Sequence, residues 1–203
     1  MNGALYAIDS TAFRAINGGS ANGLFDLIMP AITDVRNAYI PYAILFILLL
    51  WKGGTRGRWC ALLMAVTVLI TDPVNSRIIK EMVMRVRPCE ALAGVRLLVP
   101  CGGGKSFPSS HAVNNFAAAV IISYFFRRAA PYAFGVATVI AFSRVYVGVH
   151  YPGDVIGGAF VGSLMAVIVL LIWKLIIDAW NRRRDVRRAA LSDSTEPGSA
   201  GPV

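Results

Sequence analysis

The chain has 203 residues, of which 56% are hydrophobic and 15% are charged, with a formal net charge of +9. An average soluble domain carries roughly 25% charged residues, so the composition argues against a soluble enzyme and for an integral membrane protein. Much of the positive charge lies in short runs that flank apolar segments, as orientation signals do, so we expect no nucleic-acid partner. The length leaves little room for a separate soluble domain.

Residues 1–36 are mixed in character and show loose helical spacing of apolar residues, with a break at Gly18 and Gly19. We expect two short amphipathic helices here, lying at the membrane interface or against the bundle. The apolar run 37–51 then predicts the first spanning helix. Because a bilayer needs roughly 20 residues, this helix should begin upstream, near Ala31.

Four further spanning helices are predicted, over 59–84, 111–126, 131–149 and 153–180. The first of these contains Asp72, which we expect to be a hydrogen-bonded polar group facing the bundle, near backbone groups freed by Pro73. The predicted fold class is therefore all-α, a polytopic membrane helix bundle with about five transmembrane helices plus N-terminal amphipathic helices. The expected boundaries are 1–36 for the N-terminal segment, 37–181 for the transmembrane core and 182–203 for a basic tail, disordered from Ser192.

Basic residues predict the orientation. Three basic segments fall at one end of the predicted bundle: 52–58, 127–128 and 182–188. By the positive-inside rule this end is cytoplasmic, as is the C-terminus, in the inner (plasma) membrane. The other end carries residues 1–36, the loop 85–110 and the turn 149–153, and faces the periplasm or outside. The loop 85–110 is itself basic although it lies at the outer end, so the positive-inside rule does not explain its Lys and Arg residues and they need another role.

The same loop contains Cys89 and Cys101, whereas Cys60 lies in an apolar segment. An outward-facing loop meets an oxidising compartment, which would allow a disulfide between Cys89 and Cys101. The sequence alone leaves open whether the two thiols are paired.

Alternation of the spans brings three polar clusters to the outer end. They are Lys80, Arg85 and Arg87; then Ser109, Ser110 and His111; then Ser143, Arg144, His150 and Asp154. Guanidinium groups match phosphate oxygens in pairs, and a hydroxyl with the first N–H groups of a helix forms an anion site. The clusters therefore predict a phosphoryl pocket, with phosphate contacts from Lys80, Arg87, Ser109, Ser110 and Arg144.

Two histidines complete the predicted reaction. A neutral imidazole can attack phosphorus when its other ring nitrogen is held by an acceptor, so we expect His150 to be the nucleophile and Asp154 to orient it. His111 would protonate the leaving oxygen and then activate water. Because the cations supply electrostatic stabilisation, we expect no metal and no other cofactor. The predicted chemistry is hydrolysis of a phosphomonoester or diphosphate through a phosphohistidine.

Each of these residues also has a simpler explanation. Ser109 could be only an N-cap, and Asp154 only a first-turn acid favoured by the helix dipole. His150 could be a structural interfacial histidine, or both histidines could bind a metal with Asp154. Three cations could be interfacial residues whose charged ends reach water: Lys80, Arg85 and Arg87. To replace the catalytic interpretation, these simpler explanations would all have to hold at three separate places on one membrane face.

Three motifs resemble the signatures of the type-2 phosphatidic acid phosphatase superfamily: Lys80-x6-Arg87-Pro88, Pro108-Ser109-Ser110-His111 and Ser143-Arg144-x5-His150-x3-Asp154. The helical pattern extends the resemblance over about 36–180. It implies metal-independent hydrolysis in the membrane, with His150 as nucleophile, Asp154 as its partner and His111 as general acid. Ser110 departs from the usual Gly, and residues 1–36 do not supply the extra span of six-helix members.

The resemblance implies a lipid phosphate as substrate. The superfamily's soluble vanadium-dependent haloperoxidases are disfavoured by the apolar spans. Undecaprenyl diphosphate is our favoured substrate, because small size and an outward-facing site suit recycling of the polyprenyl carrier of the cell wall. Phosphatidylglycerophosphate, phosphatidic acid and lipid A phosphates are the alternatives. A non-catalytic lipid-phosphate binder is the alternative of another class, although binding would need only the cations. The sequence leaves the oligomeric state open.

Overall fold

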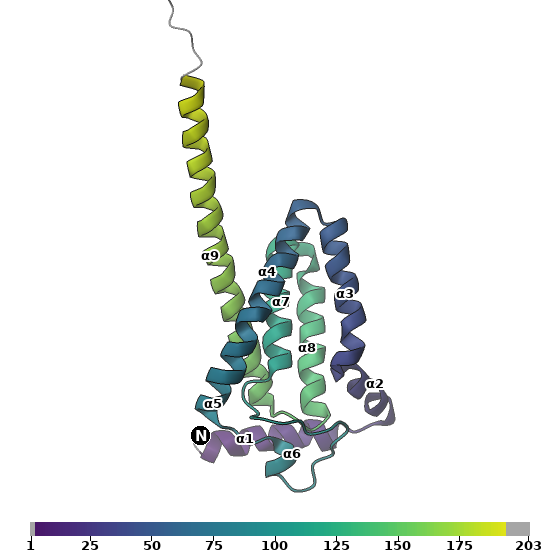
Figure 1. Cartoon of the computed structure of the whole chain (residues 1–203). Coiled ribbons are helices and arrows are strands. Elements are labelled where there is room, and N and C mark those ends of the chain that lie inside the picture. The colour runs from purple at the N-terminus through teal and green to yellow at the C-terminus, as the bar shows by residue number, and fades with distance from the viewer. Residues whose placement is uncertain (1–2, 194–203) are drawn as a thin grey trace, which may run out of the picture. The chain divides into compact units, whose positions relative to one another are not determined.

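A computed structural model describes residues 3–193 of the chain, and the burial of their side chains up to residue 188. The described residues form helices and connecting loops, with no strand among them, which confirms the all-α prediction (Figure 1). The chain divides into two compact units, one ending at Val167 and one beginning at Ile168. The predicted site lies wholly within the first unit.

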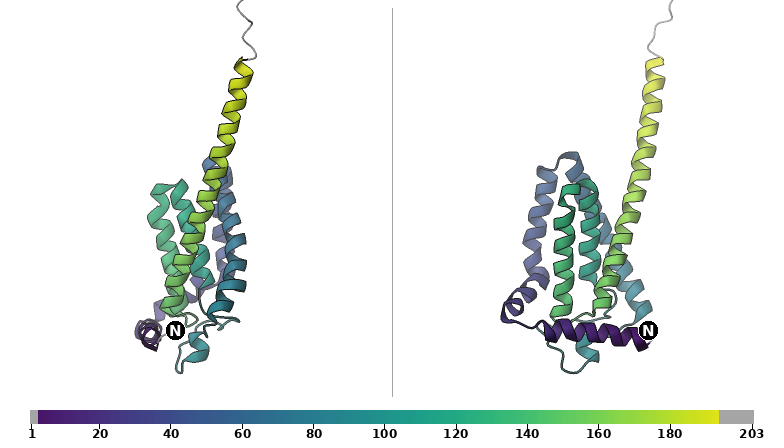
Figure 2. Two further views of the ribbon diagram at one scale, coloured as in Figure 1. Left: turned by 90° about the vertical axis from the view of Figure 1, so that its left-hand side faces the viewer. Right: turned by 180° about the vertical axis from the view of Figure 1, so that it is seen from behind.

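The first unit is built around a helix bundle. Its long helices are α3 (Val35–Trp51), α4 (Gly54–Pro73), α7 (Ser110–Phe125) and α8 (Ala130–Tyr146). The helix α7 packs against both α4 and α8, and α3 packs on α4. Figures 1 and 2 show the four running side by side, with the α3–α4 and α7–α8 connections at the same end of the bundle.

Two short helices precede the bundle, as predicted. The helix α1 (Gly3–Arg14) ends in a π-helical turn over Ala15–Gly19 and lies across one end of the bundle (Figure 2). The helix α2 (Gly23–Thr33) meets α3 at a bend of 62°. The bend explains why α3 does not begin near Ala31: the side chain of Asp34 caps α3 by accepting a hydrogen bond from the Arg36 backbone N–H at 2.9 Å.

The connection from α4 to α7 carries the first polar cluster and ends at Ser109, where the second cluster begins. After Pro73, which offers no backbone N–H, the chain makes a π-helical turn over Val74–Ile79 and the short helix α5 (Lys80–Val83). The helix α6 (Pro88–Ala91) follows in the loop. This loop contains a disulfide between Cys89 and Cys101, the pairing that the sequence left open.

The helix α9 (Pro152–Asp193) begins with a close contact to α7. A Cβ atom added at Gly158 would lie 2.8 Å from the Ser109 carbonyl oxygen, and one at Gly162 would lie 2.0 Å from that of Val113. Glycines at such positions let two helix backbones approach closely. The contact joins the starts of the two helices, where the Ser109 backbone N–H donates to the Asp154 carbonyl oxygen at 3.1 Å.

We expect Gly162→Ala to destabilise the protein, because the new methyl group would overlap the Val113 carbonyl oxygen and push the helices apart. Overpacking of this kind costs typically about 1–3 kcal/mol, measured as a lower midpoint of thermal unfolding in detergent. Gly135→Ala on α8 is the matched control, since a Cβ atom there meets nothing within 4 Å. Equal midpoints for the two variants would contradict the packing.

Two stretches of the described residues are long and apolar enough to cross a membrane, Gly54–Ala91 and Pro152–Arg188. The bent pair of α2 and α3 would make a third. The helices α7 and α8 have 16 and 17 residues, fewer than the roughly 20 that a bilayer needs. The structure therefore supports several spans, and the count of about five stays a prediction.

The described part of the second unit is the continuation of α9 from Ile168 to Asp193. The prediction ended the last span near 180 and began a separate tail at 182, but the helix continues through this boundary. Of the segment predicted to be disordered from Ser192 onward, Ser192 and Asp193 are helical and the remainder lies outside the described residues.

Candidate active site

The three polar clusters meet at the end of the bundle where α1 lies (Figure 1). One terminal nitrogen of Arg87, from the loop after α5, lies 3.2 Å from Nε2 of His150, in the turn between α8 and α9. The start of α7 joins them through the hydrogen bond between Ser109 and Asp154. Residues more than 60 positions apart, such as Arg87 and His150, are therefore direct neighbours.

His150 is buried, and each of its ring nitrogens faces a charged group. Nδ1 lies 3.5 Å from Oδ2 of Asp154, one helical turn further along the chain. A guanidinium group can only donate, so Nε2 accepts from Arg87 and the ring proton resides on Nδ1, facing the carboxylate. Burial lowers the pKa of His150 to about 4, while the nearby Asp154 carboxylate opposes that shift. The ring is therefore neutral near pH 7, with its lone pair on Nε2.

Asp154 is completely buried and is held by several donors. One carboxylate oxygen accepts from Arg85 at 2.8 Å. The other accepts from the Tyr151 backbone N–H at 2.8 Å and from the hydroxyl of Ser106. These bonds fix the carboxylate beside His150, which a solvated first-turn acid would not require.

The guanidinium group of Arg87 is fixed by backbone carbonyls. It donates to the carbonyl oxygens of Gly104 and Val149 at 3.1 Å and of Gly103 at 3.3 Å, in addition to His150. The residue is only 6% exposed. This burial and the four contacts do not fit an interfacial arginine whose charged end reaches water.

Buried polar atoms around the start of α7 that have no hydrogen-bond partner among the described residues include Ser109 Oγ, His111 Nε2 and Arg144 Nε, besides Nδ1 of His150 and Oδ1 of Asn75. Buried polar atoms are normally paired, so the atoms of Ser109, His111 and Arg144 are available to a bound group. Ser109 precedes the first residue of α7, but its side chain makes no capping bond, so an N-cap role does not account for its hydroxyl. Arg144 donates from a terminal nitrogen to Thr33 Oγ1 at 2.5 Å.

Two predicted phosphate ligands have other partners. Lys80 Nζ donates to the Lys105 carbonyl oxygen at 3.2 Å. The hydroxyl of Ser110 accepts from the Asn75 side chain at 2.9 Å and so connects α7 to the π-helical turn after α4. The serine that replaces the usual glycine thus has a structural contact of its own. Its backbone N–H remains part of the helix N-terminus.

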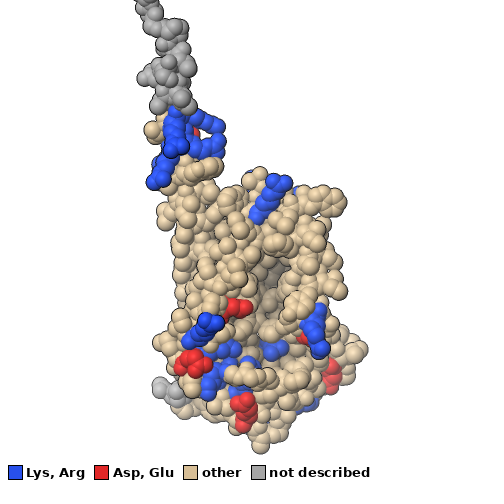
Figure 3. All heavy atoms as spheres, in the orientation of Figure 1, with Lys and Arg blue, Asp and Glu red and all other residues tan. Residues whose placement is uncertain are grey.

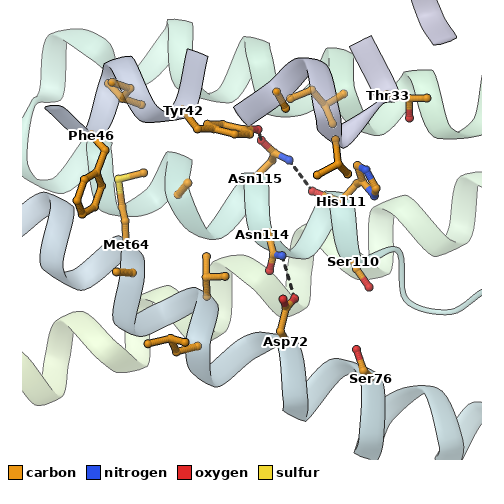
Figure 4. A pocket seen from close by; sticks show the side chains of 18 of the residues that line it. Thr33, Tyr42, Phe46, Met64, Asp72, Ser76, Ser110, His111, Asn114 and Asn115 are labelled. Atoms are coloured by element: carbon orange, nitrogen blue, oxygen red, sulfur yellow. Dashed lines mark hydrogen bonds between the residues drawn. The ribbon is translucent and has the colours of Figure 1, made fainter. Parts of the chain in front are cut away.

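A cavity of about 1130 Å³ opens beside His111, between α3, α4 and α7 (Figure 4). Its walls are mainly apolar, with Phe46 and Met64 among them. Asp72 also lines the cavity and accepts a hydrogen bond from the Asn114 side chain at 2.9 Å, as expected for a bonded polar group. A hollow is also visible on the face of the bundle shown in Figure 3.

Three residues of the site network were not predicted as site residues: Ser106, Arg85 and Asp9. Ser106 and Arg85 bind the Asp154 carboxylate, and Asp9 of α1 accepts a hydrogen bond from Arg85 at 2.5 Å. Arg85 could have been found from the sequence, because it lies two positions before Arg87, where the second predicted spanning helix ends. No sequence signal distinguishes Asp9 from an acid on the polar face of an amphipathic helix.

Comparison with known proteins gives the family. Residues 38–178 match the PAP2 superfamily. The lipid A 4'-phosphatase of Bacteroides thetaiotaomicron is 31% identical over 165 residues, which cover 77% of this chain and 72% of the relative. The undecaprenyl-diphosphatase BcrC of Bacillus subtilis is 31% identical over 159 residues, covering 77% and 79%.

Two solved structures agree with these matches. The crystal structure of Aquifex aeolicus LpxE superposes with a TM-score of 0.65 at 25% identity, over 78% of this chain and 92% of that chain. A transmembrane PAP2-type phosphatidylglycerolphosphate phosphatase from Bacillus subtilis has the same fold, with a TM-score of 0.63 at 22% identity, over 86% and 89%. The chain therefore belongs to the PAP2 superfamily and is a membrane lipid phosphatase, a hydrolase of phosphoric monoesters or diphosphates.

Proposed function

We propose that this enzyme hydrolyses a lipid phosphate or diphosphate without a metal ion, through a phosphohistidine formed on His150. The observation that carries the proposal is the buried, neutral imidazole, with Nδ1 toward Asp154 and Nε2 toward Arg87. A binding protein would need the cations but not an imidazole oriented by a carboxylate. This argues against the non-catalytic alternative.

The reaction has two steps. Nε2 of His150 forms a bond to phosphorus as the bond from phosphorus to the leaving oxygen breaks, and His111 gives its proton to that oxygen. The negative substrate favours the protonated form of His111 before this step. Water then attacks phosphorus, His111 takes a proton from it, the phosphorus–nitrogen bond breaks, and inorganic phosphate leaves. Asp154 stabilises the His150 ring by accepting from Nδ1 throughout.

The phosphoryl oxygens would lie among the buried donors at the start of α7. Arg87, Ser109 and Arg144 supply side-chain donors, and the first backbone N–H groups of α7 supply the rest. Each charge-assisted hydrogen bond is worth about 1.5–3 kcal/mol net. Lys80 would first have to leave the Lys105 carbonyl, and Ser110 would have to leave Asn75. Arg87 would also have to release Nε2 of His150 before that nitrogen can attack phosphorus.

Arg87→Lys should lower kcat/KM by roughly 10², because one ammonium group cannot replace a guanidinium fixed by three carbonyls and aimed at His150. Arg144→Lys should behave similarly. Arg96→Lys is the matched control: Arg96 pairs with Asp26 and stacks on Tyr146, with a distance of 4.9 Å to the ring centroid. Phosphate release by the purified variants in detergent measures the effect. Unchanged kinetics for Arg87→Lys would remove this residue from the phosphate site.

The cavity beside His111 supports a substrate with an apolar chain that enters from the hydrocarbon side. Undecaprenyl diphosphate is our favoured substrate, from the small size of the enzyme and its proposed outward orientation. The identity of 31% is the same to an undecaprenyl-diphosphatase and to a lipid A 4'-phosphatase, so it does not separate these two substrates. Phosphatidylglycerophosphate, phosphatidic acid and lipid A phosphates are the alternatives.

A substrate panel assayed side by side tests the proposal. We expect phosphate release from at least one of these four lipid classes, unaffected by a chelator, and fastest from undecaprenyl diphosphate. Activity lost on chelation would favour a metal site instead, and the absence of release from any lipid would favour a binder. A faster rate on another lipid would change the substrate while leaving the mechanism in place.

We further propose five spans, an outward-facing site and a cytoplasmic C-terminus. Charged side chains gather at the end of the bundle with α1, α5 and α6, and the middle of the bundle carries few (Figure 3). Basic residues also occupy the α3–α4 and α7–α8 connections at the opposite end, including Lys52 and Arg127. The disulfide between Cys89 and Cys101 supports an oxidising compartment on the site's side.

A further inference from the structure

The N-terminal helix α1 places a carboxylate next to the Asp154–His150 pair. Oδ2 of Asp9 accepts from a terminal nitrogen of Arg85 at 2.5 Å. Its other oxygen, Oδ1, accepts from the Gly153 backbone N–H at 2.7 Å. Arg85 in turn donates to Asp154 at 2.8 Å, and Gly153 is the residue before Asp154. The Asp9 carboxylate therefore binds both Arg85, which donates to Asp154, and the backbone N–H of Gly153, the residue next to Asp154.

This group of charges is enclosed. The side chains of Arg85 and Asp9 are 8% and 13% exposed, and Asp154 is fully buried. The guanidinium of Arg85 also stacks on Tyr151, with a distance of 4.0 Å to the ring centroid. Buried charges interact strongly and are costly when a partner is removed, so the three groups must act together.

We propose that Asp9 is a positioning residue for the phosphatase reaction, acting through Arg85 and the Gly153 N–H on Asp154 and hence on His150. The proposal rests on the proposed function of His150. With Asp9 present, Arg85 is shared between two carboxylates, and Asp154 keeps more of its negative charge for the Nδ1–H of His150. Without Asp9, Arg85 would pair with Asp154 alone, and His150 would become a weaker nucleophile.

The charges around His150 determine the direction in which its pKa should move when the charge of Asp9 is removed. Asp154, Arg87 and Arg144 act on His150 directly, and Arg85 and Asp9 act behind Asp154. Removing the negative charge of Asp9 makes protonation of His150 less favourable, so its pKa should fall. The acidic limb of the kcat/KM profile should therefore move to lower pH, since kcat/KM reports ionisations of the free enzyme.

Asp9→Asn in the full-length detergent-solubilised enzyme tests this, with the lipid of the four-member panel that the parent hydrolyses fastest. We expect kcat to fall roughly 10- to 100-fold with KM little changed, as is typical for groups that orient a reacting side chain, together with the shift of the acidic limb. Asp9→Glu should return the acidic limb of the kcat/KM profile to the pH seen for the parent, because glutamate keeps the negative charge. Asp26→Asn is the control: Asp26 on α2 also pairs with an arginine, Arg96, but outside the site.

Two results would overturn the inference. One is a kcat and pH profile for Asp9→Asn that equal those of the parent. The other is a fall in activity that matches a loss of folded protein, measured by thermal unfolding, with the acidic limb unmoved, since Asp9 would then only fix α1 in place. Failure of the proposed function is a separate result, because it would appear as an active His150→Ala variant.

Discussion

Replacing His150 with alanine should reduce phosphate release by roughly 10³- to 10⁶-fold, the range expected when a covalent nucleophile is lost. The ring is buried between Arg87 and Asp154, and an alanine at this position has no atom that can attack phosphorus. The remaining donors would still bind the lipid. We therefore expect kcat to collapse while substrate binding survives.

Trapping the covalent intermediate makes the test specific. With radiolabelled diphosphate substrate, the parent should acquire a label on His150, and His150→Ala should acquire none. His111→Asn should keep its label longer, because the attacking water has lost its base. Thr138→Ala on α8 is a control, since this hydroxyl only donates to the Phe134 carbonyl oxygen one turn away. Equal rates for His150→Ala and the parent would refute the assignment of the nucleophile.

Asp154→Asn should have the second largest effect, a fall in kcat of roughly 10³- to 10⁴-fold, as when an acid that orients a catalytic histidine is converted to an amide. An amide keeps one acceptor oxygen and has an NH2 group in place of the other, so it cannot accept at both positions. Its NH2 would face either Arg85, or the Tyr151 N–H and Nδ1 of His150, and these groups already donate. It would also leave Arg85 with Asp9 as its remaining carboxylate. Loss of one member of a buried charge group costs about 3–5 kcal/mol, so stability should fall as well.

The two effects of Asp154→Asn can be separated by measuring kcat per folded molecule together with thermal unfolding. Asp34→Asn is the matched control, because this half-buried residue lies outside the site and caps α3, and asparagine is an equally good N-cap. A variant that loses stability but retains kcat per folded molecule would make Asp154 structural only.

The sequence predicted the parts of this structure that depend on order and helix ends. The alternation of apolar segments was enough to expect Arg87, Ser109 and His150 at one end of one bundle. It could not say that Ser110 would turn toward Asn75, because the choice of partner depends on side-chain packing. It also could not place Asp9 in the site network, because an acid on a short amphipathic helix has the same pattern whether it meets water or Arg85.

The Cys89–Cys101 disulfide spans the loop that follows Arg87, just before the two glycines whose carbonyls hold that guanidinium. Reducing the disulfide would free this loop and let Arg87 swing away from His150 while the bundle itself stayed folded. With the outward orientation that we propose, the enzyme would become fully active only after export of this loop, and a copy whose loop still faced thiol reductants during biogenesis would turn over slowly.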